Sequence, residues 1–152
     1  MNTKTIYEQI YDKIITLIPN LENMAARSHQ VYKARGYGCI YLNILSEEKK
    51  ERLPFKIISL THYYEQNGDL IPDPDMTIKI YSHRNMAEAL TFQNCFTYQE
   101  VYPTKDTVNL TLKKQLNSFL KSWLTRCIVD MGHKFTNNEM HGDASYVLGV
   151  KQ

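Results

Sequence analysis

HYYEQNGDLIPDPDM, residues 62–76, is the stretch that indicates how the strands of this chain are connected. Its centre, QNGD at 66–69, is typical of a tight turn, because Asn and Gly tolerate positive φ angles. Its two prolines force the residues before them into extended conformations. The segments on either side, 54–64 and 76–81, alternate with a period of two and predict two strands. A connection this short joins antiparallel strands, because parallel strands need a longer crossover.

Further strands are predicted on both sides of this pair. The stretch HQVYKARGYGCIYLNIL, residues 29–45, predicts two strands around a break at Arg35-Gly36. Residues 86–92 and 96–102 predict a fifth and a sixth strand, whereas the charged residues 46–52 predict a solvated loop. Short strands joined by short turns favour an antiparallel meander of about six strands.

Two amphipathic helices flank the predicted strands. Thr5 and Glu8 have the spacing of a capping box, and apolar residues recur after them at helical spacing until Pro19. Residues 109–131 carry the longer apolar stripe, which includes Trp123. An antiparallel sheet with one apolar face needs a cover, so we expect an α+β fold with both helices on one face of the sheet.

The length of 152 residues suits one domain. We expect this domain to span residues 1–131 and a polar, partly flexible tail to span residues 132–152. Within the tail, only residues 146–150 have the pattern of a strand. Four tail side chains are potential weak metal ligands in an otherwise solvated segment: His133, Glu139, His141 and Asp143.

Composition narrows the class of protein. The net charge of +2 and the lack of a basic stripe argue against a nucleic-acid partner. Three widely spaced cysteines suit a reducing compartment. The chain has no apolar run of about 20 residues and no signal peptide, so we expect a cytoplasmic protein without a membrane segment. It also lacks GxGxxG and GxxxxGK[ST] motifs, so no cofactor is expected.

The connection at 62–76 is also the best candidate for a functional site. No Lys or Arg occurs between Lys56 and Lys79, while four acids fall within eleven positions. Oxygen ligands at this loose spacing would suit Mg or Ca, although they match no established metal-binding loop. The alternative is a rigid connection whose acids cap backbone N–H groups. A metal ion, if one binds, would take as ligands Asp69, Asp73 and Asp75.

Tyrosine is unusually frequent, with eleven in the chain. Aromatic side chains on an open sheet face can anchor a protein partner or stack on bases, although tyrosine also simply suits half-buried strands. The near-neutral charge and the lack of an RGFGF-like motif favour protein recognition. The expected binding surface combines the acids, the tyrosines and one histidine: His62, Tyr63, Tyr64, Glu65, Asn67, Asp69, Asp73, Asp75, Tyr98 and Tyr102.

Three segments resemble a bacterial family of domains of unknown function that carries an HYYxQNGDLxxDPxM signature. They are SLTHYYEQNGDLIPDPDMTIKIY (59–81), FTYQEVYP (96–103) and LNSFLKSWL (116–124). The second half of the chain is also similar to YqiB-like proteins, and the resemblance covers about residues 54–130. It implies a small bacterial, cytoplasmic protein of a kind partly carried on mobile elements, for which a counter-defence role is conceivable. It transfers no catalytic residue.

Three hypotheses about function follow from these observations. We favour a non-enzymatic interaction or regulatory module that binds a protein partner, or a second copy of itself, through the sheet face and residues 62–76. The second hypothesis is a metal-assisted enzyme that uses the acidic connection. The third is a binder of single-stranded nucleic acid that uses the sheet tyrosines.

Overall fold

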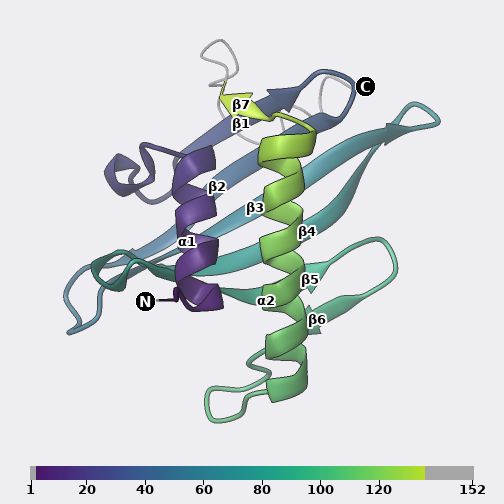
Figure 1. Cartoon of the computed structure of the whole chain (residues 1–152). Coiled ribbons are helices and arrows are strands. Elements are labelled where there is room, and N and C mark those ends of the chain that lie inside the picture. The colour runs from purple at the N-terminus through teal and green to yellow at the C-terminus, as the bar shows by residue number, and fades with distance from the viewer. Residues whose placement is uncertain (1–2, 136–152) are drawn as a thin grey trace.

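The computed structural model describes residues 3–135, and these residues form one antiparallel sheet with two helices packed on it (Figure 1). The strands are β1 (His29–Ala34), β2 (Gly38–Glu48), β3 (Phe55–Gln66), β4 (Asp69–Tyr81), β5 (Met86–Gln93), β6 (Tyr98–Glu100) and β7 (Lys134–Phe135). Their order across the sheet is β6-β5-β4-β3-β2-β1-β7, and all neighbours are antiparallel. The predicted α+β class and the antiparallel meander are therefore confirmed.

Several predicted boundaries are wrong. The sheet has seven strands instead of about six, because β7 adds to the outer edge of β1. Strand β2 runs through Glu48, so the expected loop at 46–52 is partly strand, paired with the start of β3. The expected strand at 96–102 shrinks to the three residues of β6. The expected tail strand at 146–150 lies outside the described residues.

Helix α1 (Ile6–Leu17) begins with the predicted capping box. The Thr5 hydroxyl accepts the Glu8 N–H at 3.2 Å, and the Glu8 carboxylate accepts the Thr5 N–H at 2.9 Å. A short 3-10 turn (Leu21–Asn23) follows it, and a second one (Ser82–Arg84) joins β4 to β5.

Helix α2 (Leu110–Thr125) begins at Asn109, whose side chain caps the Leu112 N–H at 3.0 Å. The predicted helix at 109–131 is confirmed in part, because its last turn is a π-helical segment (Arg126–Asp130). Such segments occur often at functional sites.

In Figure 1 the two helices lie side by side in front of the sheet, and both contact β5. One continuous core joins the helices to the sheet, with Ile14 of α1 and Trp123 of α2 as members. The alternating residues of the long central strands complete it: Ile40, Leu42, Ile44, Ile58, Leu60, Met76, Ile78 and Ile80, all at most 1% exposed. The period-two pattern of the sequence thus marks the face that packs against the helices.

The hairpin of β3 and β4 is longer than its neighbours. Strand β2 pairs with β3 only as far as Tyr63, and β5 pairs with β4 only from Asp75 onward. Residues 64–71 therefore pair only with each other across the hairpin and extend beyond the sheet (Figure 1). We call residues 64–71 the ribbon.

Candidate functional site at the ribbon

Residues 62–76 do not form an extended loop. Only Asn67 and Gly68, with φ angles of 53° and 86°, lie between the strands, which confirms the predicted turn and corrects the predicted length of the connection. Both prolines lie inside β4. Proline cannot donate a ladder hydrogen bond, and this part of β4 tolerates it because pairing with β5 begins only at Asp75.

Two of the expected surface residues belong to the outer face of the sheet, opposite the core. The Tyr63 ring meets the Tyr41 ring edge-on, with centroids 5.4 Å apart. Thr61 donates a hydrogen bond to the Asp75 carboxylate at 3.0 Å. Burial raises the pKa of Asp75, against the opposing effect of the Thr61 bond, and burial together with Asp75 raises the pKa of Tyr63. Both side chains are thus engaged in packing within the sheet.

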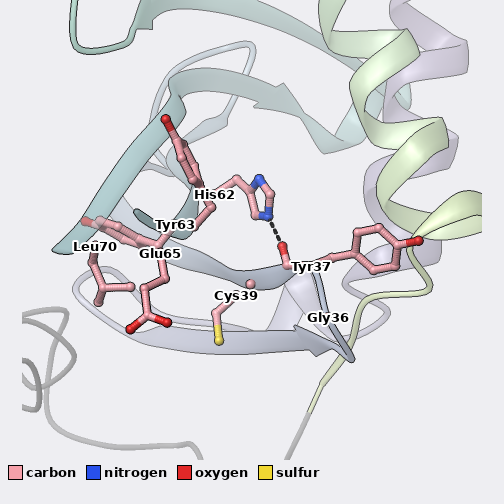
Figure 2. Close-up of a pocket in the computed structure, with 9 residues that line it drawn as sticks. Gly36, Tyr37, Cys39, His62, Tyr63, Glu65 and Leu70 are labelled. Atoms are coloured by element: carbon pink, nitrogen blue, oxygen red, sulfur yellow. Dashed lines mark hydrogen bonds between the residues drawn. The ribbon is translucent and has the colours of Figure 1, made fainter. Parts of the chain in front are cut away.

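A hollow of about 670 Å³ lies at the base of the ribbon (Figure 2). Its wall comes from the β1–β2 turn, from the end of β3 and from Leu70 on β4. Glu65 and Leu70 face each other across the hairpin, and in Figure 2 their side chains border the same space as the Cys39 thiol. The hollow therefore offers an apolar side chain, a thiol and a carboxylate together, a mixture typical of recognition surfaces.

Two histidines hold the β1–β2 turn in place. The His62 Nε2 atom lies 2.5 Å from the Tyr37 carbonyl oxygen, as drawn in Figure 2, and the His133 Nε2 atom lies 3.1 Å from the Gly38 carbonyl oxygen. The two imidazole rings meet edge-on with centroids 5.5 Å apart. Because a carbonyl needs a donor, each of these Nε2 atoms carries the proton.

The structure buries His133 at 4% exposure, so its assignment to a solvated tail is wrong. Its Nδ1 atom also lies 3.4 Å from the Cys127 carbonyl oxygen, at the end of α2. Burial lowers the pKa of His133 and the nearby His62 adds to this, while the two backbone hydrogen bonds oppose it. Its expected companions, Glu139, His141 and Asp143, lie outside the described residues.

Gly38 is required for the close approach of this turn to β3. A Cβ atom at Gly38 would lie 2.1 Å from the Tyr63 carbonyl oxygen, and the φ angle is +80°. We expect Gly38→Ala to lower the free energy of unfolding by about 2–3 kcal/mol, because it combines left-handed strain with a backbone clash. Urea denaturation monitored by circular dichroism would measure this loss.

Gly36 provides the matched control. Its φ angle is +82°, but a Cβ atom there would meet nothing within 4 Å. Gly36→Ala should therefore cost only the conformational strain, about 1–2 kcal/mol. Equal losses in the two variants would show that β3 moves away freely and that the wall of the hollow is not rigid.

The three expected metal ligands do not converge. Asp69 is exposed at the tip of the ribbon, Asp73 lies beside His62, and Asp75 is bonded to Thr61. Within residues 3–135, no group of three or more His, Cys, Asp or Glu side chains could hold a metal ion. The geometry of these residues therefore gives no support to the metal-assisted hypothesis.

The last two expected surface residues lie on or just after β6, the edge strand of the sheet. Tyr98 is 55% exposed on β6, and its hydroxyl donates to Glu100 at 3.4 Å. The Tyr102 hydroxyl accepts from Lys113 at 2.8 Å and donates to Glu88 at 2.5 Å. Since β5 separates β6 from β4, these tyrosines do not share a surface with the ribbon.

The other tyrosines are also dispersed. Tyr32 is fully buried in the core, Tyr41 is 4% exposed, and the Tyr81 hydroxyl donates to Glu88 at 3.0 Å. Within residues 3–135 the tyrosines form no continuous aromatic face for stacking bases, so their geometry gives no support to the nucleic-acid hypothesis.

The polar cluster around Glu88 was missed by the sequence analysis. Its carboxylate contacts Tyr81 of β4, Tyr102 after β6 and, at 3.5 Å, Lys113 of α2. Burial raises the pKa of Tyr102, and the bond to Glu88 adds to this. No local sequence signal could reveal the cluster, since its members come from four separate segments.

Among residues 3–135, none of the helices combines the length and apolar character that crossing a membrane requires.

Comparison with known proteins matched the chain to a protein family. The model of a family described as a domain of unknown function, DUF6908, matches residues 9–129, most of the chain. This confirms the expected membership of a family of unknown function; the match tests neither the HYYxQNGDLxxDPxM signature nor the relation to YqiB-like proteins. Neither the curated proteins nor the solved structures contain a match to the chain.

Proposed function

The chain belongs to the DUF6908 family, a domain of unknown function, and from its geometry we propose that it is a protein-interaction module that presents the ribbon to a basic segment of a partner. The observation that carries this proposal is the projection of residues 64–71 beyond both neighbouring strands. A two-stranded arm of this kind adds little to the core of the domain, so its length calls for a role in recognition.

The mode of contact follows from the edges of the ribbon. Pro72 and Pro74 interrupt the outer edge of β4, which disfavours the addition of a partner strand. Recognition would then depend on side chains. Glu65 and Leu70 supply them on the side of the Figure 2 hollow, and Tyr64 and Ile71 supply them on the other face.

The charge of the hairpin indicates the chemistry of the partner. Between Lys56 and Lys79 the chain has four acids and no Lys or Arg, and Asp69 is exposed at the tip. A partner segment with Lys or Arg beside apolar residues would complement both the acids and Leu70.

A randomised peptide library displayed against the immobilised full chain would test this proposal. We expect the enriched peptides to carry Lys or Arg together with apolar residues. The affinity of one such peptide, measured by fluorescence anisotropy, should fall as salt is raised, because the contact is exposed and charged. The variant Asp69→Asn, Leu70→Ser should weaken it by about tenfold or more.

The matched control is Glu51→Gln, Leu45→Ser, which removes an exposed acid and an exposed leucine away from the ribbon. It should leave the affinity unchanged. Enrichment of acidic or uncharged peptides would contradict the proposal, as would equal weakening by the two double variants.

Two finer predictions rest on resemblance alone: the bacterial mobile-element origin and the counter-defence role. A third, the cytoplasmic location, rests also on the spacing of the cysteines and on the lack of a signal-peptide pattern. A basic protein partner is compatible with all of them and depends on none.

A further inference from the structure

A second, smaller hollow lies where the β3–β4 hairpin meets the C-terminal end of α2. It measures about 280 Å³, just below the usual range for ligand sites. The hairpin contributes His62 and Asp73 to its lining. The helix and its π-helical end contribute Phe119, Trp123 and Arg126.

The lining of the hollow includes one acidic and one basic residue that form no ion pair with each other. Asp73, which is half-buried, and Arg126, which is exposed, both line the hollow, and neither side chain has a hydrogen bond or an ion pair with another residue of 3–135. Opposite charges that face one small space without pairing leave room for a ligand that carries both charges.

A buried polar atom of one lining residue also lacks a partner. The Trp123 Nε1 atom is buried and has no hydrogen-bond acceptor within residues 3–135. Buried N–H groups are nearly always paired, so this one needs an explanation. The His62 Nε2 atom is already engaged with the Tyr37 carbonyl oxygen.

The remaining wall includes two stacked aromatic rings. The Phe119 and Trp123 rings are stacked, with centroids 6.4 Å apart and planes 21° apart. The Phe92 ring meets Phe119 edge-on at 5.4 Å and supports it from β5. Such a wall favours an apolar side chain on the ligand.

We propose that this hollow binds a small zwitterion with an apolar side chain, of the chemical class of an α-amino acid. Arg126 binds its carboxylate, Asp73 binds its ammonium group, and the Phe119–Trp123 stack receives its side chain. A simple anion would be repelled by Asp73 and a simple cation by Arg126, so the pair selects a ligand that carries both charges. Asp73 and Arg126 both lie outside the ribbon, residues 64–71, so the two proposals can fail separately.

Isothermal titration calorimetry of the full chain with three probes would test this assignment. The probes are L-phenylalanine, 3-phenylpropanoate, which lacks the ammonium group, and phenethylamine, which lacks the carboxylate. We expect L-phenylalanine to bind, and each analogue to bind at least about tenfold more weakly.

Two variants assign the roles of the charged residues. Arg126→Gln should abolish the difference between L-phenylalanine and phenethylamine, because the carboxylate no longer has a partner. Asp73→Asn should abolish the difference between L-phenylalanine and 3-phenylpropanoate. This crossed pattern cannot arise from a general loss of folding, which would weaken all three probes alike.

The matched controls are Arg84→Gln and Asp106→Asn, two exposed positions outside the hollow. They should leave all three affinities unchanged. The proposal is overturned if L-phenylalanine gives no binding at millimolar concentration, if either analogue binds as tightly as L-phenylalanine, or if Arg126→Gln and Asp73→Asn weaken all three probes equally.

Discussion

Replacing Trp123 with alanine is expected to lower the free energy of unfolding by about 3–5 kcal/mol. Trp123 is 2% exposed, belongs to the common core of helices and sheet, and stacks on Phe119. Removing the indole would leave a cavity that the stiff sheet below it cannot fill. Urea denaturation of the wild type and the variant would measure the difference.

Two further variants make this prediction specific. Trp123→Phe should cost only about 1–2 kcal/mol, because it keeps an aromatic ring and removes an N–H group that lacks a partner. Phe96→Ala removes an aromatic ring that is 91% exposed and should change stability by no more than about 0.5 kcal/mol. A loss below about 1 kcal/mol for Trp123→Ala would mean that α2 is not part of the core.

The features that the sequence predicted correctly depend on neighbouring residues. The turn at Asn67-Gly68 follows from the φ angles that these residues tolerate, and the start of α1 follows from the reciprocal bonds of Thr5 and Glu8. The buried face of each central strand follows from alternation. Each of these signals lies within a few residues, so the pattern is sufficient to read it.

The features that the sequence missed depend on distant residues. Alternation predicted a strand that starts at Met76, but β4 begins at Asp69, which pairs with Gln66 of β3. Its two prolines are tolerated because β5 leaves that part of its edge unpaired. The pairing of β7 with β1 brings residue 135 beside residue 32, and no local pattern encodes it. The burial of His133 has the same origin, since its partner Gly38 is 95 positions away.

The candidate site was predicted in composition but not in arrangement. His62 and Asp73 do share one hollow. Alternation and the bulge after Thr61 place Tyr63 and Asp75 in the packing of the outer face instead. The groups that complete the hollow come from α2, and their approach to the hairpin depends on how the helix docks, which a sequence pattern does not specify.

Lys56 shows how strongly one docking contact can hold this fold. Its ammonium group is buried at the start of β3, where it donates to the carbonyl oxygens of Leu21 at 2.8 Å, Glu22 at 3.1 Å and Met24 at 2.6 Å. The Glu47 carboxylate, 3.5 Å away, balances its charge. This single side chain therefore joins the segment after α1 to two strands of the sheet.

Lys56→Met is expected to lower the free energy of unfolding by about 3–4 kcal/mol, although methionine matches the lysine stem in length and shape. The loss arises because the buried carbonyl oxygens of the 3-10 turn are left without a donor and Glu47 without its counter-charge. Urea denaturation would measure it, with Lys50→Met at an exposed position as the control, for which we expect a change within about 0.5 kcal/mol. A loss below about 1 kcal/mol at Lys56 would mean that water replaces the ammonium group, and that the segment after α1 is held by Leu21 and Met24 packing alone.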